Sequence, residues 1–134
     1  MILARFYKSE SGEILSVSVS GHAGMAEEGS DIVCAAASAL VYTAIGALEE
    51  LCGFQDYYRI AEDSDGDSVP FTEIRLPESE GKIRETAGII LRTLEIGFKQ
   101  LELTVNGEFV QAEEIRNVFG GENHDNDEFA AFCS

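Results

Sequence analysis

Residues 21–40 read GHAGMAEEGSDIVCAAASAL, and they join a glycine-rich loop to the start of a long apolar helix. The loop shows no hydrophobic periodicity, and it contains Gly21, Gly24 and Gly29, which we expect to act as hinges. Ser30 or Asp31 is a good N-cap for the helix that follows. The stretch therefore predicts a mobile loop that runs into a helix N-terminus, with a histidine near one end and a cysteine beyond the other.

The segments before this stretch predict a β-hairpin. Apolar and polar residues alternate over residues 2–7 and 14–20, which is the period-two pattern of half-buried strands, and the turn-forming segment SESGE joins the two. In the second strand we expect one face to be apolar and the other to carry serines. The apolar face consists of Leu15, Val17 and Val19, and the solvated face consists of Ser16, Ser18 and Ser20.

The segments after it predict a second helix and further strands. Residues 32–51 are apolar nearly all round, so we expect a helix that is buried on most sides. The runs 54–61 and 69–76 flank EDSDGDS, whose Asp65-Gly66 pair favours a second hairpin. Residues 79–101 carry apolar side chains at helical spacing. The Asn106-Gly107 pair gives a further hairpin-like signal in the segment up to residue 115, which completes or extends the sheet.

These elements predict an α+β fold in the order β-β-α-β-β-α-β, with an antiparallel or mixed sheet of hairpins and two main helices. A chain of 134 residues is long enough for one hydrophobic core and too short for two. We therefore expect a single domain over residues 1–115. The acidic tail that follows, residues 116–134, is expected to be loosely held because it has few apolar residues.

Charge and composition exclude several classes of protein. The chain has 9 Lys and Arg against 25 Asp and Glu, for a formal net charge of -16. This field repels nucleic acid and anionic membrane surfaces and favours a basic partner, although solubility alone also explains an acidic surface. No run approaches the roughly 18 consecutive apolar residues of a membrane helix, and the N-terminus lacks a signal-peptide pattern. We therefore expect a cytoplasmic protein.

The cysteines and carboxylates do not form a metal-binding pattern. Cys34, Cys52 and Cys133 are odd in number and unrelated in spacing, which fits reduced thiols better than disulfides or zinc ligands. Part of EDSDGDS looks like a calcium loop, but it lacks the downstream glutamate and flanking helices, so a plain turn is favoured. A metal on His22 and Cys34 would lack further ligands. We expect neither a metal nor a cofactor.

Cys34 is the candidate nucleophile. It falls in the first turn of the predicted helix, where the free N–H groups and the helix dipole favour an anion, so we expect its thiol pKa to lie below the ordinary value of about 8.5. The backbone amides of Cys34 and Ala35 are candidates for the oxyanion hole of an acyl transfer. The alternative is a structural cysteine, buried in its helix as we expect Cys52 to be.

His22 is the candidate base and acid. It directly follows a strand end, and the path from the hairpin to the helix would bring its imidazole near Cys34, where it takes the thiol proton and later protonates a leaving amine. The alternative is an exposed loop histidine. His124, in the acidic tail, is a weaker candidate because nothing organises it. Asp31 either caps the helix or orients the histidine, and capping is favoured because its position alone accounts for it.

Read together, GHAG at residues 21–24, Gly29, and DIVCAAASAL at residues 31–40 resemble the signature of the bacterial ribosomal-processing cysteine protease Prp family. The similarity extends in length and element order from Met1 to about Ile115. One departure is Ala37, where a larger β-branched residue is expected, and the acidic tail is another.

The resemblance implies a cytoplasmic cysteine endopeptidase that removes an N-terminal extension from the precursor of a large-subunit ribosomal protein, cutting after an aromatic-rich site. Carried over by motif position, Cys34 is the nucleophile, His22 is its base and acid, and Asp31 supports them. The resemblance also implies a homodimer. The alternative function is that of a non-catalytic acidic chaperone or assembly factor, which would hold the basic ribosomal protein by charge alone.

Overall fold

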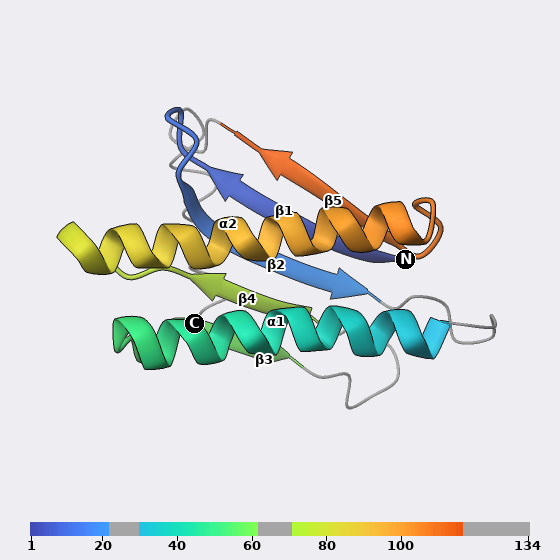
Figure 1. Ribbon diagram of the computed structural model, residues 1–134, viewed down its shortest axis with the longest axis horizontal. Coiled ribbons are helices and arrows are strands. Elements are labelled where there is room, and N and C mark those ends of the chain that lie inside the picture. Colours follow the sequence, from blue (N-terminus) through green and yellow to red (C-terminus); the bar gives the residue numbers. More distant parts are fainter. Residues whose placement is uncertain (22–29, 62–70, 117–134) are drawn as a thin grey trace.

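The computed structural model describes residues 1–21, 30–61 and 71–116, and its elements follow the predicted order β-β-α-β-β-α-β (Figure 1). They are β1 (Ile2–Lys8), β2 (Ile14–Gly21), α1 (Ser30–Cys52), β3 (Tyr58–Ala61), β4 (Phe71–Arg75), α2 (Gly81–Thr104) and β5 (Val110–Ile115). The α+β class is confirmed. The predicted tail lies outside the described residues except for Arg116, and so does the Asp65-Gly66 turn.

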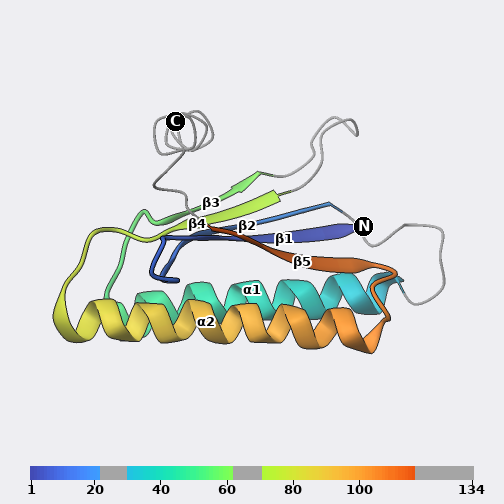
Figure 2. The same cartoon turned by 90° about the horizontal axis from the view of Figure 1, so that it is seen from above.

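The strands form one five-stranded mixed sheet in the order β3-β4-β2-β1-β5. Neighbouring strands pair antiparallel except β1 and β5, which are parallel, because α2 carries the chain back across the sheet between β4 and β5. Both helices lie side by side on one face of the sheet (Figure 2). The result is a two-layer fold with its core between sheet and helices.

The core is formed where α1 and α2 meet the central strands. Phe6 of β1 packs against Phe98 of α2 with ring centroids 6.2 Å apart, and Val17, Leu48 and Leu91 are buried beside them. Each of these side chains contributes about 1.5–3 kcal/mol by leaving water. The period-two pattern of β1 therefore identified its buried face correctly. The helical spacing of α2 did so from Ala87 to Phe98, whereas Ile83, at the start of the same spacing, is 45% exposed.

The expected alternation in β2 is wrong at its start. Lys8 pairs with Ile14 and Tyr7 pairs with Ser16, which leaves Leu15 as an extra residue opposite β1. This bulge places Ile14 in the core, while Leu15 is 38% exposed and Ser16, expected on the solvated face, is buried. Beyond the bulge Val17 is buried as predicted. A single inserted residue changes which side chains face inward because the side-chain period of a strand is two.

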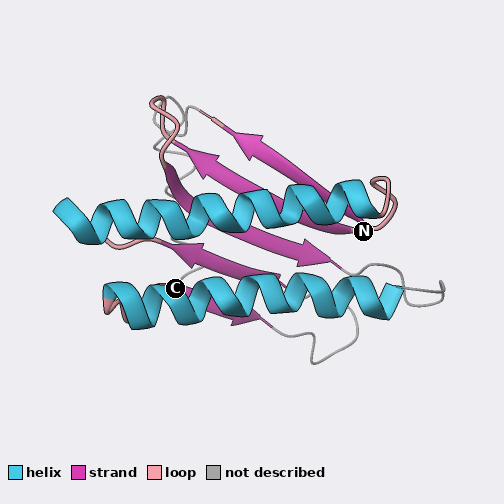
Figure 3. Ribbon diagram, in the orientation of Figure 1, coloured by secondary structure: helices cyan, strands magenta, loops and turns pink. Residues whose placement is uncertain are grey.

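The hairpin expected at Asn106-Gly107 is also wrong. The helix α2 continues to Thr104, and the pair then reverses the chain into β5 rather than joining two strands (Figure 3). Asn106 and Gly107 both have positive φ, and the amide of Gly107 donates to the carbonyl of Glu102 over 2.9 Å. Left-handed residues end helices as readily as they form hairpins, so the pair alone does not distinguish the two.

The expectation that α1 is buried on most sides is wrong for the single chain. Val33, Val41 and Leu48 face the sheet, but Ile32 is 75% exposed and Leu51 is 66% exposed. The expectation that no segment approaches a membrane helix does not hold by mean hydropathy. At a mean hydropathy of 1.8, the helix from Ile32 to Cys52 meets the length and composition criteria of a membrane span, although its buried face packs in the core. Packing within one chain thus accounts for only one face of its apolar surface.

Candidate active site

Cys34 lies near the start of α1 and lines a cavity of about 250 Å³. Its side chain is partly buried and packs against the hydrophobic core. The cavity is lined by three parts of the fold: the first half of α1, the ends of β1 and β2, and the β3–β4 pair. The lining residues are Ile2, Val19, Gly21, Cys34, Ala37, Ser38, Val41, Tyr42, Ile60, Ala61, Phe71 and Thr72. The thiol therefore faces a largely apolar cavity.

Gly21 places the end of β2 beside this cavity. It has φ +95°, and a Cβ atom built there would clash with the backbone carbonyl oxygen of Met1. Gly21 is therefore the paired end of a strand, opposite Ile2, rather than the free loop hinge that we expected. Only glycine fits this close approach of two backbones. The strand end is thus fixed where the chain reaches the cavity.

His22, Gly24 and Gly29 lie outside the described residues, so the Cys34–His22 dyad stays a prediction. The geometry that bears on it is the position of Gly21, the residue immediately before His22, in the lining of the Cys34 cavity. One peptide bond thus separates His22 from a cavity-lining residue. This is the juxtaposition of strand end and helix start that the dyad requires.

Asp31 lies within α1, because the helix begins at Ser30 rather than after Asp31. The choice between helix capping and histidine orientation stays open, since its side chain is outside the described part of the structure. The bounds of α1 weigh against the expected oxyanion hole, because the amides of Cys34 and Ala35 come after the first turn and donate within the helix. The free amides of such a helix belong to Ser30, Asp31 and Ile32.

Cys52 is a buried thiol that contrasts with Cys34. It is 8% exposed, and its Sγ lies 3.8 Å from the carbonyl oxygen of Ile83. Burial raises the pKa of this thiol, which disfavours the nucleophilic thiolate. The expectation of a buried, structural Cys52 is confirmed.

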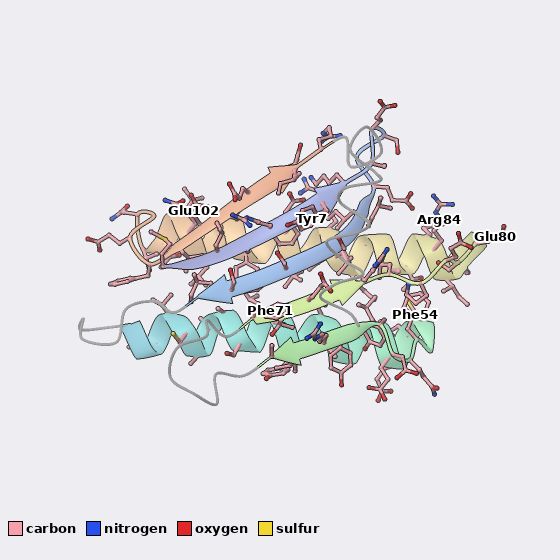
Figure 4. The ribbon with its side chains drawn as sticks, turned by 180° about the vertical axis from the view of Figure 1, so that it is seen from behind. Tyr7, Phe54, Phe71, Glu80, Arg84 and Glu102 are labelled. Carbon is pink, nitrogen blue, oxygen red and sulfur yellow. The ribbon has the colours of Figure 1, made fainter. Side chains whose placement is uncertain are left out.

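Several cavity residues escaped the sequence analysis. Ser38 and Tyr42 follow Cys34 at helical spacing, so the periodicity of α1 could have placed them on the same face as the thiol. Ile60 and Phe71 could not have been found in this way. They reach the cavity only because β3 and β4 pair with each other and β4 pairs with β2 (Figure 4).

A partly exposed thiol that lines a cavity is accessible to a peptide, as the nucleophile of a cysteine protease must be. Comparison with known proteins gives the same class. A family model described as cysteine protease Prp matches residues 1–110. The chain belongs to the cysteine protease Prp family, and it is a cysteine protease.

Three relatives illustrate the match. The ribosomal processing cysteine protease Prp of Bacillus subtilis is 36% identical over 110 residues, which cover 79% of this chain and 98% of the relative. A crystal structure from Streptococcus mutans is 32% identical with a TM-score of 0.69, and the match covers 87% of this chain and 95% of that one. The essential ribosomal processing protease Prp of S. aureus, in complex with a covalently linked product peptide, is 27% identical with a TM-score of 0.67, covering 85% and 99%.

Proposed function

We propose that this protease removes the N-terminal extension from the precursor of a large-subunit ribosomal protein, with Cys34 as nucleophile and His22 as base and acid. The observation that carries the proposal is the apolar cavity beside the Cys34 thiol. The names of the B. subtilis and S. aureus relatives support it, because they describe ribosomal processing proteases, and S. aureus Prp has been crystallised with a substrate peptide.

The proposed reaction proceeds in two steps. His22 takes the proton of the Cys34 thiol, and the thiolate attacks the carbonyl carbon of the scissile peptide bond. The tetrahedral intermediate collapses to a thioester, and His22 gives its proton to the departing amine, which leaves as the new N-terminus of the mature protein. Water, deprotonated by His22, then attacks the thioester carbonyl and releases the extension as a free acid together with the Cys34 thiol.

The cavity favours a large apolar side chain next to the scissile bond. Its volume of about 250 Å³ suits one aromatic side chain, and Val41, Ile60 and Phe71 give it apolar walls. This agrees with cleavage after an aromatic-rich site, which the family resemblance implies. The net charge of -16 supports a basic substrate, because opposite charge raises the rate of encounter.

We also propose a cytoplasmic homodimer formed through the helical layer. On α2, Ile89, Ile96 and Leu103 recur every seven residues and are all exposed, so they form an apolar stripe along one side of the helix. Next to it, α1 and α2 enclose an apolar groove of about 590 Å³. Gly97 lies against Leu40 in this groove, where a Cβ atom would stand 2.8 Å from the Leu40 Cδ2 atom. A second copy would remove this surface from water.

The dimer is tested by Ile89→Glu, which places a charge in the groove, with Ile83→Glu as the control on an exposed position outside it. Analytical ultracentrifugation should show a dimer for the unaltered chain and for Ile83→Glu, and a monomer for Ile89→Glu. A monomer at all concentrations for the unaltered chain would contradict the proposal.

Cleavage is tested with a peptide that spans the N-terminal junction of the precursor. Cys34→Ala should abolish product formation, measured by mass spectrometry, while Cys52→Ala should retain it. His22→Ala should reduce it by at least about a hundredfold, the ordinary contribution of a general base. Cleavage that persists in Cys34→Ala would end the proposal, and salt-sensitive binding without any product would favour the acidic chaperone instead.

A further inference from the structure

β3 is an edge strand whose last residues enter the candidate active site. Among the described strands, β3 pairs only with β4, so its other side is an open edge. Its final residues, Ile60 and Ala61, line the same cavity as Cys34. An extended chain lying along this edge would therefore run directly to the thiol.

The register shows which backbone groups face outward. The amide of Arg75 donates to the carbonyl of Tyr57 over 2.8 Å, and Arg59 stands opposite Glu73 in the same ladder. In an antiparallel pair, the backbone groups of successive residues point alternately toward the partner strand and away from it, so residues 57, 59 and 61 form hydrogen bonds with β4. Tyr58 and Ile60 thus direct their N–H and C=O groups away from the sheet.

The side chains along this edge also suit a peptide. Tyr58 is 44% exposed and Ile60 is 39% exposed. They pair with Ile74 and Thr72 of β4, so their side chains lie on the face of the sheet that the helices cover. Tyr42 of α1, which is also exposed, lines the cavity with Ile60. Alternate side chains of an added strand would pack against these groups, as cross-strand neighbours do.

The other edge of the sheet is protected. On β5 the outward amide of Ala112 donates to Glu102 Oε1 over 2.9 Å, so a side chain of α2 already occupies it (Figure 4). β5 also carries Glu113 and Glu114, paired with Arg5 and Lys8. Capped amides and charges are what keep an edge strand from pairing with another chain. Among the described residues, no side chain caps the outward amides of Tyr58 and Ile60, and the one charged residue of β3, Arg59, lies over the ring of Phe71.

From these observations we infer that the peptide substrate binds as an added β-strand along β3, with main-chain hydrogen bonds to Tyr58 and Ile60. The inference rests on the proposed function, since it concerns how the same site holds its substrate. At about 3.3 Å per residue, the strand Tyr58–Ala61 would hold roughly four substrate residues on one side of the scissile bond. Recognition would then depend on backbone as well as on one apolar side chain.

Two variants of Ile60 separate backbone from side chain. Ile60→Ala removes the apolar side chain and keeps the outward N–H, whereas Ile60→Pro removes both. Proline is tolerated on an edge strand because the ladder bonds of its neighbours survive. Ala112→Pro is the matched control, since it removes an outward amide on the distant edge. We expect kcat/KM for the precursor peptide to fall about tenfold further in Ile60→Pro than in Ile60→Ala, and to be unchanged in Ala112→Pro.

A second measurement does not depend on how the variants fold. A series of substrate peptides, each methylated at one backbone nitrogen, is bound to the Cys34→Ala protein, and the affinity is measured by fluorescence anisotropy. Methylation should weaken binding at every second residue of the peptide. Equal kcat/KM in the two Ile60 variants, or losses without alternation, would overturn the inference while leaving the protease function intact. If the unaltered chain cleaves no precursor peptide, the proposed function itself fails.

Discussion

Replacing Lys8 by methionine should strongly destabilise the fold, because it leaves a buried carboxylate without its main partner. The Lys8 Nζ atom lies 3.0 Å from Glu95 Oε2 and 2.7 Å from Glu114 Oε1, and the side chain of Glu95 is 0% exposed. Arg92 and Lys99 also reach Glu95, at 2.7 and 3.5 Å, but both are about half exposed. Of these three cations, Lys8 is thus the one that is buried with the carboxylate of Glu95.

The magnitude follows from this asymmetry. Removing one partner of a buried ion pair costs about 3–5 kcal/mol, and we expect the lower end because Arg92 and Lys99 remain near Glu95. For a chain of this size, 3 kcal/mol lowers Tm by about 12 °C. Glu95→Leu should cost less than Lys8→Met, since Lys8 keeps the carboxylate of Glu114.

The assay is a double-mutant cycle by thermal or urea unfolding. The variant Lys8→Met/Glu95→Leu has no unpaired buried charge and should be at least as stable as Lys8→Met alone, with a coupling energy of about 2 kcal/mol. If the two single losses simply add to within about 0.5 kcal/mol, the residues do not act as a buried pair and the reasoning is refuted.

Three further predictions concern pH, the strand end and the thiols. Stability should fall as pH drops from about 5 toward 2. Burial alone would raise the pKa of Glu95, but Lys8 holds it below its ordinary value, and hydrogen bonds from Lys8 and Arg116 lower the pKa of Glu114 to about 2, so the folded state keeps both groups ionised after the unfolded chain has taken up protons. Melting temperatures at pH 7 and pH 3 should therefore differ less in the Lys8→Met/Glu95→Leu variant than in the unaltered chain. Gly21→Ala should destabilise the fold by about 1–3 kcal/mol and lower cleavage, because its φ is +95° and its Cβ would clash with Met1; an unchanged Tm would contradict this. In a Cys133→Ser background, iodoacetamide should label Cys34 well before Cys52, as peptide mapping can show, and equal rates would contradict the contrast between a cavity thiol and a buried one.

The order of elements could be predicted because each has a strong period of its own. β1 alternates strictly, and α2 places Ala87, Leu91, Leu94 and Phe98 on one face. The strand order could not be predicted in the same way. The parallel pairing of β1 with β5 depends on where α2 returns the chain, and nothing local in residues 110–115 specifies it.

The burial of Glu95 with Lys8 could not be predicted from hydrophobic periodicity either. Glu95 follows Leu94 and lies three residues before Phe98, a little under one helical turn. It therefore lies on the apolar face of α2, where a sequence pattern predicts a hydrophobic residue. Its partner Lys8 is distant in sequence and meets it only in the folded sheet. A charge on an apolar stripe is a signal that some opposite charge is buried with it, but the pattern does not say which.

In the candidate site, too, one part could be predicted from local sequence and another part could not. Cys34 could be singled out from its place beyond a glycine-rich loop at a helix start, and its cavity confirms that the thiol has an accessible side. The walls of that cavity come from β3 and β4, which lie far along the chain from Cys34 and reach it through strand pairing. Local sequence therefore singles out the candidate nucleophile, whereas the shape of the cavity beside it is a property of the whole sheet. Substitutions in β3 should accordingly change which peptides are cleaved, and those at Cys34 should decide whether any peptide is cleaved.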